Sequence, residues 1–334
     1  MEAVGVRTFL HSPNRRPFLA SVIGPEAQQL ATHDDITTIQ VRPGWLGGPH
    51  LDLRATGPVD WDGVAAVLAA GSRRHPGTPP SEADYLRQAA GLGDIEGVDA
   101  PYPPLRGHGD IELLAGVRAD SLGTLSDRGR ALLLPPLLGA ATADGPGALL
   151  AAVAEALLVL ADTHPHGLRF GVFSLRSHAE AFFHWAGPAA DYRSSFAARM
   201  GKEGPVLDQL VRRVQAGDEA GPASEWRYAF NACGAEFAGL NAAAMASFDA
   251  RPEVTGSAFH RAVAASGVIA ETPAWFPGYR LLINLFYQLL PALDIRPVQR
   301  FYLCYALAER VDAVVGETWQ QRLAAVESLM AASR

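Results

Sequence analysis

Apolar and polar residues alternate along two short stretches in the first sixth of the chain. Ile39 and Val41 alternate with polar neighbours before a glycine-rich turn, and Leu51 and Leu53 do the same after it. A period of two on both arms is typical of β-strands, and glycine and proline between them mark a turn. The stretch Ile39–Gly57 is therefore predicted to form a β-hairpin.

Two patterns precede this hairpin. Val4–Leu10 alternates in the manner of a strand. Pro17–Ala31 has helical spacing, and we expect Gly24 and Pro25 to divide it, because both residue types interrupt helices.

Helix starts follow the hairpin. Asp60 is placed to cap a helix that runs to Gly71, and Ser81 opens a second short helix in the manner of a capping box. Strand and helix signals together predict a mixed structure for about residues 1–145.

The pattern becomes helical after about residue 145. The predicted helices are Ala148–Asp162, Ser174–Trp185, Val206–Gln215, Tyr228–Phe248, Tyr279–Leu290 and Pro297–Val315. Strands in one part and helices in the other predict an α+β fold, since a parallel sheet would need alternating βα units. We expect one domain over 1–334, with a largely helical part at about 146–334.

Composition narrows the class of protein. The 334 residues carry a formal net charge of −7 and no basic block, so nucleic acid is not an expected partner. The longest apolar run, Ala148–Ala161, contains Glu155 and is too short to cross a bilayer. Cys233 and Cys304 are isolated among apolar residues, which predicts reduced, buried thiols and a cytoplasmic protein.

No sequence motif predicts a metal or an organic cofactor. His178 and His184 are six positions apart, about 240° around a helix at 100° per residue, and cannot share one face. His164 and His166 lie in a turn with no third ligand nearby. The glycine pairs of the chain complete neither a dinucleotide-binding nor a Walker loop.

The polar face of the hairpin is the first candidate site. Arg42, His50, Asp52 and Arg54 would project from adjacent strands. Guanidinium and imidazole groups so arranged can hold a carbonyl, a carboxylate or a developing oxyanion. The alternative is a solvated hairpin face without a ligand.

Two polar stripes on apolar helices are further candidates. Arg280, Asn284 and Tyr287 recur at i, i+4 and i+7. A second stripe consists of Tyr302, Tyr305, Glu309 and Asp312. Such stripes are costly to bury unless they face a cavity or each other, although tyrosines can also bury their rings at a boundary.

Three segments resemble a known superfamily. GGPHLDLR, which ends the hairpin, resembles the GGPHLRLR-type hairpin of the thiopeptide-type bacteriocin biosynthesis domain, the elimination module of class I lantibiotic dehydratases. FSLRSHAEAFF and NLFYQLLPALDIRPVQRFYLCYALAERVD are more similar to its relatives, the standalone pyridine synthases of thiopeptide pathways. The resemblance extends from Ile39 to Asp312 and implies an elimination-domain-like α+β fold.

One departure separates the two subfamilies. The eliminating enzymes carry a pair of arginines in this hairpin, and here the first position is Asp52 and only Arg54 remains. The resemblance therefore implies a pyridine synthase, which joins two dehydroalanines of an azole-bearing precursor peptide in a formal [4+2] cycloaddition. Loss of water and of the leader peptide then gives the pyridine-centred macrocycle. No metal or organic cofactor is expected for this reaction.

The resemblance also implies roles for individual residues. Tyr279 and Tyr287 are assigned as hydroxyl donors or proton shuttles, with Ser247 as a partner hydroxyl. Arg54 and His50 are expected to polarise a carbonyl. The expected peptide-binding residues are Arg42, Trp45, Asp52, Arg176, His178, Arg280 and Asn284.

Two alternatives stay open from the sequence. The chain could be the glutamate-elimination component of a split class I dehydratase, or a leader-peptide docking protein without chemistry of its own. In each case the expected partner is a modified precursor peptide of leader and core, with other pathway enzymes as further candidates. Neither nucleic acid nor a membrane is expected.

Overall fold

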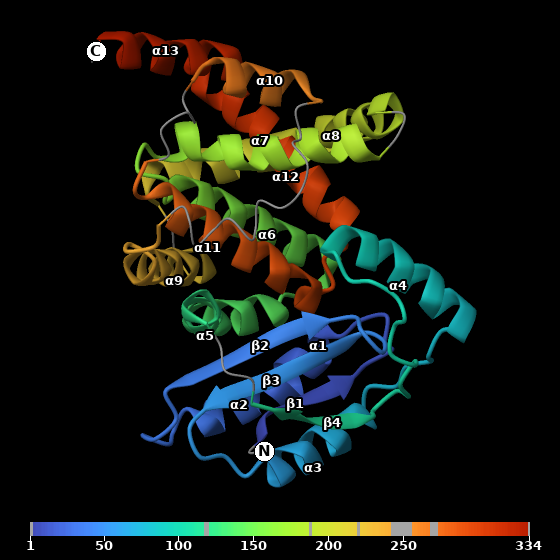
Figure 1. Cartoon of the computed structure of the whole chain (residues 1–334). Coiled ribbons are helices and arrows are strands. Elements are labelled where there is room, and N and C mark those ends of the chain that lie inside the picture. Colours follow the sequence, from blue (N-terminus) through green and yellow to red (C-terminus); the bar gives the residue numbers. More distant parts are fainter. Residues whose placement is uncertain are drawn as a thin grey trace. The chain divides into compact units, whose positions relative to one another are not determined.

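The computed structural model describes residues 3–116, 120–186, 189–218, 221–241, 256–267 and 273–332 (Figure 1). It contains helices and one four-stranded antiparallel sheet, so the predicted α+β class is confirmed. The chain forms two compact units, Met1–Thr142 with Asn284–Ile295, and Ala143–Ile283 with Arg296–Arg334. The first unit holds the sheet and the second is helical.

The sheet confirms the predicted hairpin and the predicted first strand. Its strand order is β2-β3-β1-β4, and every neighbouring pair is antiparallel. Val41, Leu53 and Val6 lie in register across three strands and form a buried apolar face. The strands are β1 (Ala3–Phe9), β2 (Thr38–Gly44), β3 (His50–Thr56) and β4 (Ile111–Ala115).

The helical segment after β1 is continuous. It consists of α1 (Arg16–Phe18), the π-turn η1 (Leu19–Ile23) and α2 (Gly24–Leu30), so the expected division at Gly24 and Pro25 is wrong. The Gly24 N–H donates to the Leu19 carbonyl, which is the i→i+5 bond of a π-turn. Pro25 lies in the first turn of α2, where its missing N–H is tolerated.

Both predicted helix caps of the first unit are confirmed. Helix α3 (Trp61–Ser72) starts after Asp60, whose carboxylate accepts a backbone N–H at 3.1 Å. Helix α4 (Glu82–Glu96) starts after Ser81, whose hydroxyl accepts a backbone N–H at 3.1 Å. Helix starts are predictable because cap bonds depend on residues three positions apart.

Helix α5 (Ser121–Ala141) was not expected from the sequence. It contains Pro135 and Pro136, which are unfavourable inside a helix. Leu133 and Leu137 are buried, and α5 packs against β2 (Figure 1). Tertiary burial of its apolar side therefore outweighs the local cost of the prolines.

The second unit confirms that helices follow residue 145, with corrections to their ends. The helices expected from Ser174 and Val206 begin earlier, at Leu168 and Ala189. The expected helix Tyr228–Phe248 also begins earlier, at Pro222, and this helix ends at Glu236, while residues 242–248 lie outside the described residues. The helices of this unit are α6 (Gly145–Asp162), α7 (Leu168–Trp185), α8 (Ala189–Ala216), α9 (Pro222–Glu236), α10 (Ala258–Ala265), α12 (Pro297–Val315) and α13 (Trp319–Ala332). Helix α11 (Phe276–Leu289) starts in this unit, and its last residues, with the 3-10 turn η3 (Leu290–Leu293), belong to the sheet-containing unit.

Helix α6 forms the core of the second unit. Its 18 residues are long and apolar enough to cross a membrane by length and hydropathy. Half of them are buried, however, and α7, α8 and α9 pack against the helix. This burial is what a core helix of a helical bundle requires.

Candidate active site

The polar face of the sheet is a network of arginines and aspartates. Asp52 lies in register with Arg42 of β2 and with Arg7 of β1. Arg7 donates to both Asp52 oxygens, at 2.8 and 3.1 Å, in a bidentate pair. Arg42 pairs with Asp127 of α5, and Arg130, one turn further along α5, lies 3.3 Å from the same carboxylate.

This face is not a solvated surface. His50 and Asp52 are buried, and Arg7 and Arg54 keep less than a quarter of their side-chain surface exposed. The alternative of a fully solvated hairpin face is therefore wrong, and ligand binding at this face stays a prediction. Helix α5, which the sequence pattern did not predict, supplies the residues that meet this face from the side of β2.

Two glycines make room for the functional side chains of β3. A Cβ at Gly44 would lie 2.1 Å from His50 Nε2, and a Cβ at Gly5 would lie 2.8 Å from Arg54 Cγ. Each glycine is the register partner of the residue that it accommodates. Glycine is thus needed at both positions because the side chains lie over the neighbouring strand.

Arg54 is the arginine of this network whose donors remain available. Its Nε is buried and lies 3.7 Å from Asp52, too far for a hydrogen bond, and Arg54 makes no hydrogen bond to any residue that the structure describes. Asp52 is already engaged by Arg7. Arg54 therefore presents a half-buried guanidinium whose N–H groups can bind an oxygen acceptor.

Positive groups surround Arg54. Burial, together with the Arg42 guanidinium, lowers the pKa of Arg54. Burial, with Arg42 and Arg54 also contributing, lowers the pKa of Arg130 to about 10, so both groups remain cations at neutral pH. Four guanidinium groups meet here with the carboxylates of Asp52 and Asp127, and this arrangement favours an anionic or strongly dipolar ligand.

His50 is neutral in this setting. Burial, with the positive charge of Arg7, lowers its pKa to about 4. Its Nδ1 lies 2.9 Å from the Gly48 carbonyl, which can only accept, so Nδ1 carries the proton and Nε2 has the lone pair. His50 is therefore a hydrogen-bond acceptor, and this changes the role that the sequence had assigned to it.

Tyr279 lies in the helical unit, at the start of α11. Its hydroxyl donates to the Gly171 carbonyl at 3.4 Å and is also within hydrogen-bonding reach of Ser174. Burial raises the pKa of Tyr279 well above its ordinary value, so the hydroxyl stays protonated. It is a hydrogen-bond donor that does not ionise near neutral pH.

His178 and Arg280 are brought together in the same unit. Burial lowers the pKa of His178 to about 3, and the positive charges of Arg300 and Arg280 add to this effect. His178 is therefore neutral, as His50 is. Arg176, two positions before His178 on α7, has a different surrounding: it donates to Glu309 at 2.7 Å and to Asp312 at 2.9 Å.

The remaining sequence-predicted residues have separate environments. Tyr287 is buried next to Phe286, and Asn284 is half-buried. Trp45 packs edge-on against Tyr102, with ring centroids 5.9 Å apart. Ser247 lies outside the described residues. The roles of these side chains stay predictions.

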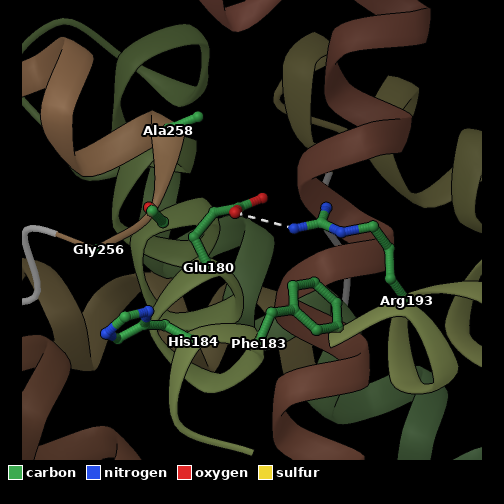
Figure 2. A pocket seen from close by; sticks show the side chains of 7 residues that line it. Glu180, Phe183, His184, Arg193, Gly256 and Ala258 are labelled. Atoms are coloured by element: carbon green, nitrogen blue, oxygen red, sulfur yellow. Dashed lines mark hydrogen bonds and ion pairs between the residues drawn. The ribbon is translucent and has the colours of Figure 1, made fainter. Parts of the chain in front are cut away.

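A cavity of about 390 Å³ lies in the helical unit (Figure 2). Arg193 pairs with Glu180 at 2.9 Å across it and lies over the ring of Phe183 at 4.2 Å. The lining residues are Glu180, Phe183, His184, Arg193, Gly256, Ser257 and Ala258. Among the described residues, no group of three potential ligands could hold a metal ion.

Sequence reasoning missed several residues of the polar face. Arg7 is a polar position of a predicted strand, and strand alternation alone could have placed it on a face with other polar groups. Asp127 and Arg130 lie on a helix that was not predicted. Only knowledge of the α5 packing could have joined them to Arg42.

Comparison with known proteins supports the fold. No protein-family model and no curated protein sequence matches the chain. The solved structure of TbtD, the pyridine synthase from thiomuracin biosynthesis, matches with a TM-score of 0.75 at 20% identity over 94% of this chain and 99% of that one. The crystal structure of TsrL matches with a TM-score of 0.65 at 18% identity over 96% of this chain and 97% of that one.

These matches cover both compact units. They bear out the resemblance to pyridine synthases at the level of the fold, whereas the likeness to the lantibiotic elimination domain stays a prediction. The chain therefore has a thiopeptide pyridine synthase-like fold.

Proposed function

We propose that this protein is a pyridine synthase of thiopeptide biosynthesis. Its substrate would be a precursor peptide whose core carries azoles and two dehydroalanines, and no metal or organic cofactor takes part. The two alkenes combine in a formal [4+2] cycloaddition, and water and the leader peptide then leave to form the pyridine. The cytoplasm, where precursor peptides are made, is the proposed location.

The observation that carries this proposal is the available guanidinium of Arg54. One backbone amide must become its iminol tautomer to act as a 2-azadiene, and charge develops on the amide oxygen as it does so. A preorganised donor at a half-buried site stabilises such an oxygen far better than water does. Arg54 can provide that donor because it makes no hydrogen bond to a described residue, and Asp52, which lies 3.7 Å away, is hydrogen-bonded to Arg7.

His50 fits a different role from the carbonyl polarisation first expected. It lies on the same face of β3 as Arg54 but four residues away, about 13 Å at 3.3 Å per strand residue. Both side chains cannot bind one amide. His50 is 3% exposed and its Nδ1 is bonded to the Gly48 carbonyl, so it would hold the turn of the hairpin in place beside the peptide.

Tyr279 is the proposed donor for the departing water. A hydroxyl that stays protonated can donate a hydrogen bond to a leaving oxygen throughout the reaction. Most of the remaining rate enhancement would come from holding the two alkenes face to face, since orientation alone can contribute several kcal/mol.

A mass-resolved assay tests the proposal. The purified protein is incubated with a synthetic leader–core peptide that carries azoles and two dehydroalanines. The expected products are the leader as its C-terminal amide and a core peptide lighter by one water. Binding without any change of mass would instead support a docking protein. Conversion of a glutamylated serine precursor to dehydroalanine, without pyridine formation, would support the eliminating enzyme.

The same assay tests the role of Tyr279. We expect Tyr279→Phe to lower single-turnover rates by about 10²–10⁴, as for loss of a general acid. Tyr228→Phe is the matched control, because Tyr228 is 77% exposed and distant in sequence from the proposed donors. A Tyr279→Phe rate equal to that of the control would make the Tyr279 hydroxyl structural and transfer its role to Tyr287 or Ser247.

A further inference from the structure

Five aromatic side chains form an open cluster in the helical unit. His164 lies at its centre, with ring centroids 4.6 Å from Trp275, 5.3 Å from Tyr279 and 5.5 Å from His166. Phe170 extends it from His166, at 6.0 Å. Most of these contacts are edge-to-face, which is the geometry that aromatic rings prefer.

The cluster differs from the aromatic core of the same unit. In the core, Phe196, Phe301, Tyr302 and Tyr305 are at most 8% exposed. In the cluster, His166 is exposed and the other four rings are only half-buried. A group of rings that packs together yet remains open to solvent is typical of a binding surface rather than of a core.

The cluster is electrically neutral at its centre. Burial, with a contribution from His166, lowers the pKa of His164 to about 4, and burial keeps the Tyr279 hydroxyl protonated. The surrounding charges are peripheral: Arg169 lies over Phe170 at 5.6 Å and is paired with Glu317, and Asp162 accepts from Arg227. The centre offers no charged partner to an anionic ligand, whereas a flat uncharged ring could pack against these rings.

His164 also presents one defined hydrogen-bond donor. Its Nδ1 accepts the backbone N–H of His166 at 3.1 Å, so the neutral imidazole carries its proton on Nε2. Nε2 has no hydrogen-bond partner among the described residues. The site therefore combines ring faces and edges with a single N–H group, and a ring that bears a nitrogen acceptor would use both.

We infer that the cluster of His164, His166, Phe170, Trp275 and Tyr279 is a binding site for a thiazole-type ring of the modified peptide. The inference rests on the proposed function, because an azole-bearing core is the substrate proposed there. The ring nitrogen accepts from His164 Nε2, and the ring packs against the open aromatic side chains. This contact would hold the peptide beside Tyr279, the proposed donor to the leaving water.

Binding of an unreactive probe tests the inference apart from catalysis. The probe is a short peptide amide with two consecutive thiazoles and no dehydroalanine, and its affinity is measured by calorimetry. We expect His166→Ala and Phe170→Ala each to weaken binding about tenfold, as for loss of one aromatic stacking partner. Tyr228→Ala, which removes an exposed ring elsewhere, should leave the affinity unchanged.

A second probe tests the hydrogen bond. Replacing both thiazoles by phenyl rings keeps the stacking surface and removes the nitrogen acceptor. The wild-type protein should prefer the thiazole probe, and His164→Phe should abolish that preference while it retains binding of the phenyl probe. Because the comparison is between two probes on one variant, a general loss of folding is recognised by loss of both.

The outcomes separate this inference from the proposed function. If the thiazole probe does not bind, or binds equally to wild type, His166→Ala and Phe170→Ala, the inference is wrong even if pyridine forms. If ring-dependent binding is found and no pyridine forms from the full precursor, the azole site stands and the proposed reaction is wrong.

Discussion

Arg54 and Arg176 carry the same group in opposite surroundings. The sequence had predicted that Arg54 polarises a carbonyl and that Arg176 binds the peptide. Arg54 keeps 23% of its side-chain surface exposed and makes no hydrogen bond to the described residues. Arg176 keeps 5% exposed and is bonded to two carboxylates, at 2.7 and 2.9 Å.

The two arginines differ in the number of nearby carboxylates that accept hydrogen bonds from them. On the sheet, Arg7 donates to both oxygens of Asp52, and Arg54 lies 3.7 Å from the same carboxylate, too far for a hydrogen bond. On α12, Glu309 and Asp312 accept from the two terminal nitrogens of Arg176, while its buried Nε has no hydrogen-bond partner among the described residues. Asp312 also pairs with Arg322. An arginine remains available to a ligand where cationic side chains outnumber carboxylates around it. The sequence alone does not show which charged side chains lie near one another.

The largest expected effect tests the available arginine. Arg54→Ala should lower the rate of pyridine formation by about 10²–10³, as for loss of one oxyanion-type donor. The free energy of unfolding should change by less than about 1 kcal/mol, because the variant loses no hydrogen bond and relieves repulsion among like charges.

Rate measurements under single-turnover conditions and urea unfolding check the two halves of this prediction. Arg54→Lys is the informative companion, since it keeps the charge and loses the planar fork of donors. A variant Arg54→Ala that binds peptide poorly but reacts at the wild-type rate once saturated would make the hairpin a docking surface.

Arg176→Ala should have the reverse profile. It breaks a buried ion pair and should lower the free energy of unfolding by about 3 kcal/mol. This is the lower end of the usual range, because Asp312 keeps Arg322 and Glu309 is 35% exposed. Arg176→Ala protein that remains folded should form pyridine at the wild-type rate.

The matched control for Arg176 is Arg169→Ala, on the same helix. The Arg169–Glu317 pair is exposed, at 45% and 36%, and its loss should cost no more than about 1 kcal/mol. Equal destabilisation by the two substitutions in chemical unfolding would contradict the distinction between a buried structural arginine and a surface one.

The last prediction concerns the dependence of the free energy of unfolding on pH. It sharpens the contrast between cationic arginines and neutral histidines. The folded-state pKa values of His50 and His164 are lowered from 6.5 to about 4, and that of His178 to about 3. Each histidine therefore binds its proton more readily in the unfolded state. The stability that each neutral histidine contributes is fully present above pH 6.5, and it is lost as the pH falls from 6.5 toward 4.

Unfolding free energies measured at several pH values check this slope. Each histidine should contribute at most about 1.4 kcal/mol per pH unit within this window. His50→Gln should make the curve shallower than that of the wild type, because one histidine with a lowered folded-state pKa is gone. Parallel curves for the two proteins would mean that His50 has the same proton affinity in both states.

Local order was predictable from the sequence by itself. The strand Ala3–Phe9, the hairpin of β2 and β3, the caps at Asp60 and Ser81 and most helices of the second unit follow from patterns that span two to four residues. The α+β class follows from their distribution along the chain. Such patterns are reliable because strand alternation, helix periodicity and cap bonds are local interactions.

The candidate site was decided by the tertiary structure. Arg42 meets Asp127 across 85 positions, and Arg176 meets Glu309 across 133, so neither partner could be chosen from spacing. The same holds for burial, which makes His50 and His164 neutral. Residue type and local pattern determine which side chains share a face, whereas the charge state and availability of those side chains depend on distant groups that only packing brings near.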